Sequence, residues 1–190
     1  PSKLIAIGGL SGSGKSRLSR ELAHYLGASP GARIARSDVL RKRLAGVAPA
    51  SRLGLQGYTG EMTAQTYRAL YHEARTALLA GQSVVADAVF AAPEERRAIA
   101  ALAAELDVPF RGIWLEAPAP VMIERVTART GDASDADADV VARQLTYELG
   151  DIDWPRLDSS GSREQTLAGG LAIADPQGQR QAFNIASTGR

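Results

Sequence analysis

A glycine-rich stretch near the start of the sequence has the composition of a phosphate-binding loop. Residues 9–16 have the sequence GLSGSGKS, which fits the pattern Gly-x-x-x-x-Gly-Lys-Ser. Glycines let backbone N–H groups converge on phosphate oxygens, where a Cβ would clash or forbid the required dihedral angles. Lys15 would reach the β- and γ-phosphates, and Ser16 would give its hydroxyl to Mg²⁺. The pattern predicts ATP and Mg²⁺ as cofactors. The expected nucleotide-binding residues are Gly9, Ser11, Gly12, Ser13, Gly14, Lys15, Ser16, Arg17 and, from farther along the chain, Arg125.

An aspartate at the end of a later apolar run is the expected metal-side partner of this loop. Residues 84–88 have the sequence VVADA, so that Asp87 ends the run and Ala88 follows it. Hydrolysing P-loop motors and switches usually carry Asp-Glu at such a strand end, where the glutamate organises an attacking water. A lone Asp87 therefore predicts a metal-side carboxylate in a protein of another class. Capping of the next segment is the alternative role for Asp87.

A second aspartate occupies a position suited to substrate chemistry. Asp38 lies just beyond the apolar run 32–36, and Arg41 lies one helical turn farther on. At the carboxyl end of a parallel strand, a carboxylate can bond an acceptor hydroxyl and take its proton during phosphoryl transfer. Arg41 could hold an anionic group on the same helix face. Capping of the following helix is the alternative role for Asp38, and it is compatible with catalysis.

Two arginines predict a lid. Arg125 and Arg129 share a helix face beside the acidic run 131–139. A hinged segment that carries arginine can exclude water and neutralise the charge that develops on the phosphates. We therefore expect a lid at about 125–143, with Arg129 as the stronger catalytic candidate. A solvated helix end is the alternative explanation.

Basic residues surround Asp38 in the sequence: Arg33, Arg36, Arg41, Lys42, Arg43 and Arg52. Such a cluster suits an anionic acceptor, although an ordinary basic helix surface would give the same pattern. Residues 46–60, which include Arg52 and Tyr58, are numerous enough to form a substrate flap.

Hydrophobic periodicity predicts the elements that position these residues. Strand-like runs occur at 3–8, 32–36, 83–86, 110–115 and 156–158. Helical patterns occur at 15–26, 39–45, 61–79, 93–106, 118–128 and 139–149, and in the tail at 163–171 and 182–186. This alternation predicts a single domain over 1–190 with a three-layer α/β/α P-loop NTPase fold. We expect a mostly parallel five-stranded sheet and a helical lid.

Composition limits the partners and the compartment. Lys and Arg number 22 against 21 Asp and Glu, so no global field draws the chain to nucleic acid or membranes. The absence of cysteine excludes disulfides and thiolate metal sites and suits a reducing compartment. With neither a signal peptide nor a membrane span in the sequence, we expect a cytoplasmic location.

Together these motifs resemble the small P-loop kinases, which include gluconate kinase, shikimate kinase, the zeta toxins and polynucleotide 5′-hydroxyl kinase. The resemblance covers about 5–158. The chain is similar in particular to a branch of bacterial kinases often fused behind an aminoglycoside-phosphotransferase-like domain. It shares with them SDxxRKxL at 37–44, VxDAxF at 85–90 and GDASDA at 131–136. The resemblance implies that Asp38 is the acceptor-activating base, Arg41 a substrate or transition-state contact, and Arg125 or Arg129 a lid arginine.

The leading hypothesis is an ATP-dependent kinase that moves the γ-phosphoryl group to a hydroxyl of a small-molecule acceptor. Two alternatives remain open. The basic cluster and the Asp-x-x-Arg spacing would also suit a 5′-hydroxyl polynucleotide kinase. A core strand at the very start would also suit a nucleotide-binding regulatory module of a larger fusion protein.

Overall fold

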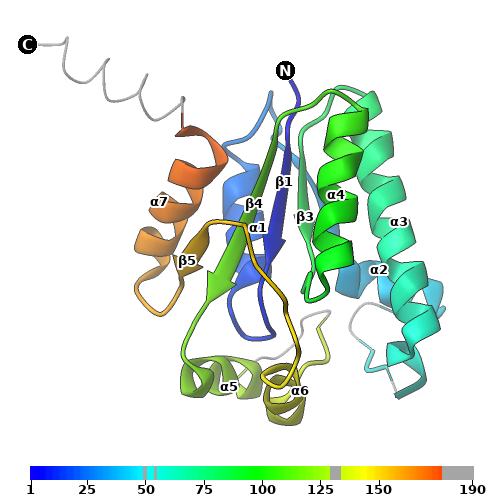
Figure 1. Ribbon diagram of the computed structural model, residues 1–190, viewed down its shortest axis with the longest axis vertical. Helices are drawn as coiled ribbons and strands as arrows, with labels where there is room; N and C mark the ends of the chain where they lie inside the picture. The colour runs from blue at the N-terminus through cyan, green and yellow to red at the C-terminus, as the bar shows by residue number, and fades with distance from the viewer. Residues whose placement is uncertain (49–50, 54, 129–133, 177–190) are drawn as a thin grey trace, which may run out of the picture.

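A parallel five-stranded sheet forms the centre of the molecule in the computed structural model, which describes residues 1–48, 51–53, 55–128 and 134–176 (Figure 1). The strands are β1 (Leu4–Gly8), β2 (Arg33–Arg36), β3 (Val84–Asp87), β4 (Phe110–Glu116) and β5 (Arg156–Asp158). Their order in the sheet is β2-β3-β1-β4-β5, and every pairing is parallel. The predicted sheet is therefore confirmed.

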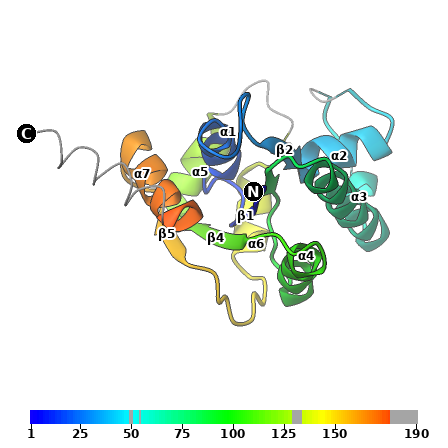
Figure 2. The same cartoon turned by 90° about the horizontal axis from the view of Figure 1, so that it is seen from above.

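Helices cover both faces of this sheet. They are α1 (Lys15–Ala23), α2 (Ser37–Leu44), α3 (Gly60–Leu79), α4 (Pro93–Glu105), α5 (Ala119–Thr127), α6 (Ala138–Gln144) and α7 (Arg163–Ala174), with a short 3-10 turn, η1 (Leu55–Tyr58). Seen from above, α1 and α4 lie on opposite sides of the strands (Figure 2). The three-layer α/β/α arrangement is as predicted.

The sheet separates two hydrophobic cores, and β1 contributes to both. Leu4 and Ala6 pack in a cluster with side chains of α3 and α4, whereas Ile5 and Ile7 pack with α1 and α7. Successive side chains of a strand point to opposite faces, so an uninterrupted apolar run is needed when both faces are covered. The fully buried β1 therefore fixes the start of the loop that follows it.

Several helix boundaries differ from the predicted ones. The first helix ends at Ala23 rather than residue 26, and the chain then turns through Gly27, whose φ is +80°. The lid helix ends at Gln144 rather than residue 149. The predicted tail helix at 182–186 lies outside the described residues. No helix in the described part of the chain is long and apolar enough to cross a membrane.

Candidate active site

The phosphate loop joins β1 to α1, in the strand-loop-helix context that the sequence predicts. Gly9, Gly12 and Gly14 have φ values of +137°, +81° and +96°, a region that side chains with a Cβ rarely adopt. A Cβ on Gly12 would lie 2.4 Å from the backbone carbonyl oxygen of Met122 in α5. The loop therefore needs glycine both for its curvature and for its close contact with α5.

The two expected metal ligands lie within reach of one cationic group. Asp87 is paired in register with Arg36 on the neighbouring strand β2, and its side chain is buried. Arg36 Nε lies 3.3 Å from Asp87 Oδ2, and Arg36 Nη2 donates to Ser16 Oγ at 3.0 Å. One guanidinium thus contacts an oxygen of each residue, and their shared role as Mg²⁺ ligands remains a prediction. The sequence groups Arg36 with the basic residues around Asp38 and therefore predicts a place near the acceptor. Its position at the end of β2 was the signal that could have placed it beside Asp87.

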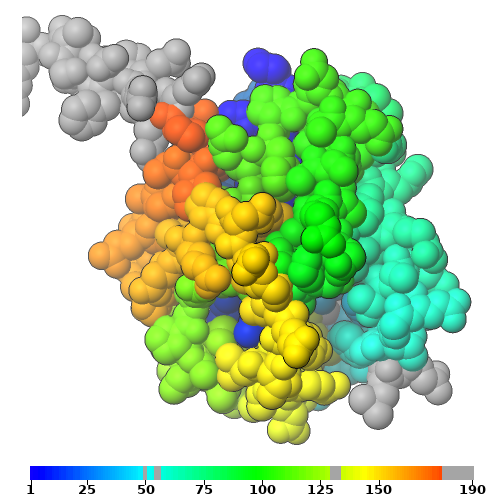
Figure 3. All heavy atoms as spheres, in the orientation of Figure 1, coloured from blue at the N-terminus to red at the C-terminus, as the bar shows by residue number. Residues whose placement is uncertain are grey.

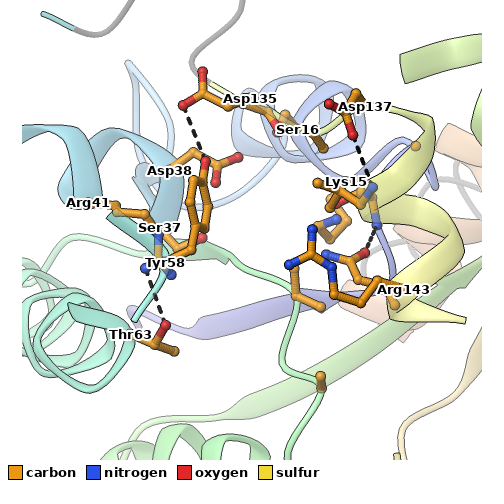
Figure 4. A pocket seen from close by; sticks show the side chains of 18 of the residues that line it. Lys15, Ser16, Ser37, Asp38, Arg41, Tyr58, Thr63, Asp135, Asp137 and Arg143 are labelled. Atoms are coloured by element: carbon orange, nitrogen blue, oxygen red, sulfur yellow. Dashed lines mark hydrogen bonds between the residues drawn. The ribbon is translucent and has the colours of Figure 1, made fainter. Parts of the chain in front are cut away.

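Asp38 lies in the same cavity as the phosphate-loop residues. This cavity has a volume of about 490 Å³ and is lined by Lys15, Ser16 and Asp38, among others (Figure 4). Burial raises the pKa of Asp38, and the negative charge of Asp87 raises it further, while Lys15 and Arg36 act in the opposite direction. The N-cap residue of α2 is Arg36, and Asp38 lies within the first turn. The geometry therefore suits a proton acceptor in the cavity rather than the cap residue of the helix.

Arg41 lines this cavity but also binds the predicted flap. Its Nη1 donates to the backbone oxygen of Gly57 at 2.9 Å and to Thr63 Oγ1 at 3.3 Å. Its guanidinium carbon lies 5.0 Å from the ring centroid of Tyr58, a cation-π distance. Arg41 is buried, so these contacts hold the flap against α2. Its predicted contact with substrate remains a prediction.

The basic cluster around Asp38 does not form one surface. Arg33 and Arg43 both pair with Glu73, on the outer side of α3. Lys42 pairs with Asp135 and is 1% exposed. A strand and a helix direct neighbouring side chains to different sides, so closeness in sequence does not bring these charges together. The alternative of an ordinary basic surface holds for Arg33 and Arg43, whereas Arg41 and Arg52 line the cavity.

Helices α5 and α6 lie beneath the carboxyl ends of the strands, where the lid was predicted (Figure 1). In the space-filling view the yellow-green and yellow atoms of these two helices form the lower end of the molecule (Figure 3). Arg125 of α5 donates from Nη1 to the Gly12 carbonyl at 3.3 Å and from Nη2 to the Ser159 carbonyl at 2.6 Å. It thus braces the loop from outside the cavity. Arg17 is exposed in the first turn of α1, and Arg129 lies outside the described residues.

Sequence reasoning missed two residues of α6. Arg143 lines the cavity and its side chain lies on the Lys15 side of it (Figure 4). Gln144 is buried and accepts a hydrogen bond from the backbone N–H of Ser11 at 2.7 Å. Both lie at the end of the predicted lid, and the only available clue was their position on a helix that follows an acidic run. The lid is therefore fixed to the phosphate loop from two helices, through Arg125 and Gln144.

The chain is similar in sequence and in fold to known proteins. Residues 4–148 match the model of the AAA domain family AAA_33. The uncharacterized protein Rv2004c of Mycobacterium tuberculosis is 31% identical over 173 residues, which make up 87% of this chain and 33% of that protein. The chain thus spans about a third of the length of this relative.

Two kinases are also similar to the chain. An adenylyl-sulfate kinase of Myxococcus xanthus is 34% identical over 122 residues, covering 64% of this chain and 62% of that protein. The crystal structure of a gluconokinase from Sinorhizobium meliloti superposes with a TM-score of 0.64 at 20% identity, covering 100% of this chain and 98% of the other. The chain therefore belongs to the AAA domain family AAA_33 and has the fold of the small P-loop kinases, as its motifs predict.

Proposed function

We propose that this chain transfers the γ-phosphoryl group of ATP to a hydroxyl of a small metabolite. The observation that carries the proposal is the shared cavity, which is lined by Lys15 and Ser16 of the phosphate loop and by the half-buried Asp38. A kinase needs a donor site and a proton acceptor within one water-excluding space. The similarity to an adenylyl-sulfate kinase supports the same class of reaction.

The roles of the donor-side residues follow from their positions. The backbone N–H groups of the loop and the Lys15 ammonium bind the phosphates, and Ser16 and Asp87 hold Mg²⁺. When bound, Mg²⁺·ATP supplies the phosphoryl group and the charge neutralisation that its transfer requires. Arg143 extends into the cavity from α6 and is suited to neutralise charge on the phosphates.

Asp38 acts on the acceptor. Its carboxylate accepts the proton of the attacking hydroxyl while the acceptor oxygen bonds to phosphorus and ADP departs. A raised pKa makes Asp38 a better proton acceptor than an exposed aspartate, provided that it is ionised when the substrate binds.

The acceptor end of the cavity favours a small polar molecule. Its walls near Asp38 carry the hydroxyl groups of Ser37, Tyr58 and Thr63. With Arg33 and Arg43 on an outer surface, these walls do not form the continuous basic track that a polynucleotide backbone requires. A metabolite rich in hydroxyl groups suits them better, and Arg52 adds one cation that could bind an acidic substituent.

One observation favours a second candidate function. Because the chain matches only 33% of the length of Rv2004c, it could serve as a nucleotide-binding regulatory module within a longer protein. Acceptor-dependent ADP release distinguishes the two functions, since a regulatory module would show only slow hydrolysis that no acceptor accelerates.

An acceptor screen tests the proposal. ADP release would be measured with ATP and Mg²⁺ across sugars, sugar acids, adenylyl sulfate, nucleosides and 5′-hydroxyl oligonucleotides, with Lys15→Ala as the blank. Once an acceptor is found, Asp38→Asn should reduce kcat by about 10² to 10⁴-fold. Full transfer rates in Asp38→Asn would rule out the proposed base.

A further inference from the structure

A buried ion pair joins two residues, Lys42 and Asp135, to which the proposed mechanism gives no role. Lys42 belongs to SDxxRKxL and Asp135 to GDASDA, and the two residues are 93 positions apart. Lys42 Nζ lies 2.9 Å from Asp135 Oδ1, with side-chain exposures of 1% and 9%. A buried charge is costly unless it is paired and hydrogen-bonded. Each of these two side chains therefore depends on the other to remain buried.

Asp135 also holds the flap. Its Oδ2 accepts a hydrogen bond from the backbone N–H of Leu53 at 2.7 Å and one from the Tyr58 hydroxyl at 3.2 Å (Figure 4). One carboxylate therefore receives donors from α2 and from two points of the flap. This arrangement uses both oxygens of the carboxylate, which an amide side chain cannot reproduce.

The flap is thus bound from two sides. Arg41 holds it from α2 through the Gly57 carbonyl and the Tyr58 ring, and Asp135 holds it from the segment before α6. Tyr58 and Leu53 line the cavity beside Asp38. The position of the flap consequently determines the shape of the acceptor end.

The segment that carries Asp135 is also tied to the phosphate loop. Asp137 caps α6 by accepting from the backbone N–H of Val140 at 3.0 Å. At the other end of this short helix, Gln144 accepts from the Ser11 backbone N–H. A helix of about two turns therefore connects the flap contact with the nucleotide-binding loop.

We propose that Asp135 is a positioning residue for the acceptor, which holds the flap against α2 and links it through α6 to the phosphate loop. This inference rests on the proposed function, because it takes the flap side of the cavity as the acceptor end. Its consequence is that occupancy of the phosphate loop stabilises the flap.

Hydrogen-deuterium exchange of the flap tests the inference. In Asp135→Asn, the Leu53 amide and its neighbours should exchange on the order of tenfold faster than in the wild type, with exchange in β1 and α1 unchanged. Asp137→Asn is the matched control, because it removes the same charge two residues away and asparagine caps a helix as well as aspartate does. Flap exchange should not change in this control.

Addition of AMPPNP and Mg²⁺ tests the link to the phosphate loop. In the wild type we expect slower exchange in both the loop and the flap, whereas in Asp135→Asn only the loop should be protected. Wild-type flap exchange in Asp135→Asn, or flap protection by AMPPNP that persists in it, would overturn the inference. If AMPPNP and Mg²⁺ protect the phosphate loop in none of the proteins, the result counts against the proposed function. The role of Asp135 is still decided in that case, because exchange at Leu53 is also compared between Asp135→Asn and the wild type without nucleotide.

A second variant and a kinetic measurement guard against simple unfolding. Lys42→Met/Asp135→Leu removes both charges of this pair together. With an acceptor from the screen, both variants should raise the KM for the acceptor on the order of tenfold and leave the KM for ATP nearly unchanged. Equal effects on both KM values would indicate a general structural role and overturn the inference.

Discussion

Arg36 and Ser16 are joined by a hydrogen bond of 3.0 Å that links the end of β2 to the first turn of α1. The same guanidinium lies against Asp87 at the end of β3, with side-chain exposures of 16% and 5% for Arg36 and Asp87. Three segments that are distant in sequence therefore meet at one cation. This contact organises the metal side of the site around a protein side chain.

Arg36→Met should destabilise the protein, because it leaves the buried Asp87 carboxylate without this partner. The expected loss in the free energy of unfolding is about 3 kcal/mol, measured by urea denaturation in EDTA. Arg33→Met is the matched control on the same strand, since its ion pair with Glu73 is exposed and should contribute about 0 to 1 kcal/mol. Equal losses in the two variants would contradict the assigned role of Arg36.

Asp38→Asn should stabilise the nucleotide-free protein at alkaline pH while it reduces transfer. Because the folded-state pKa of Asp38 lies above its ordinary value of 3.8, its contribution to stability is fully present below that value. That contribution is lost as the pH rises through the folded pKa. The melting temperature of Asp38→Asn should therefore exceed that of the wild type at pH 8, with a difference that shrinks toward pH 4.

Scanning fluorimetry from pH 4 to pH 8 in EDTA measures this difference. Asp107→Asn is a suitable control, because Asp107 is exposed and has a φ of +52°, which asparagine also tolerates. A lower melting temperature for Asp38→Asn at pH 8 would show that the ionised carboxylate stabilises the fold.

Arg96, which is not among the residues that line the cavity, should be a determinant of stability. It is buried and donates to four carbonyl oxygens, those of Phe90, Ala91, Leu149 and Asp151. Arg96→Ala should lower the free energy of unfolding by about 3 kcal/mol or more, because these acceptors lose their donors in a buried site. Arg97→Ala, on the exposed face of the same helix, should cost less than about 1 kcal/mol, and a similar loss in both variants would refute the assignment.

Gly12→Ala should abolish nucleotide binding. The new Cβ would meet the Met122 carbonyl at 2.4 Å in a backbone conformation with φ of +81°. Gly46→Ala shares the positive φ, at +70°, but has open space around the added atom, so it should cost only about 1 kcal/mol. Titration with a fluorescent ADP analogue measures the nucleotide affinity of both variants. Wild-type affinity in Gly12→Ala would contradict the close packing of the loop on α5.

The features that could be predicted from the sequence are those in which the important residues are neighbours along the chain. The phosphate loop after β1 and Asp87 at the end of β3 follow from short motifs attached to apolar runs. The contacts of Arg36 and Lys42 could not be predicted in the same way, because they depend on strand register and on where the lid segment packs. Arg125 illustrates the difference, since its helix was predicted but its contact with the Gly12 carbonyl requires the packing of α5 on the loop.

The four carbonyl groups that accept hydrogen bonds from Arg96 also limit where the chain can tolerate insertions. Two of these carbonyl groups, at 90–91, belong to the connection that follows β3, and the other two, at 149–151, belong to the segment that follows α6. An insertion that moved these two segments apart would leave the buried guanidinium of Arg96 without some of its acceptors. The described hydrogen bonds of Arg96 do not involve the flap, so the flap depends on its own contacts with Arg41 and Asp135 rather than on this network.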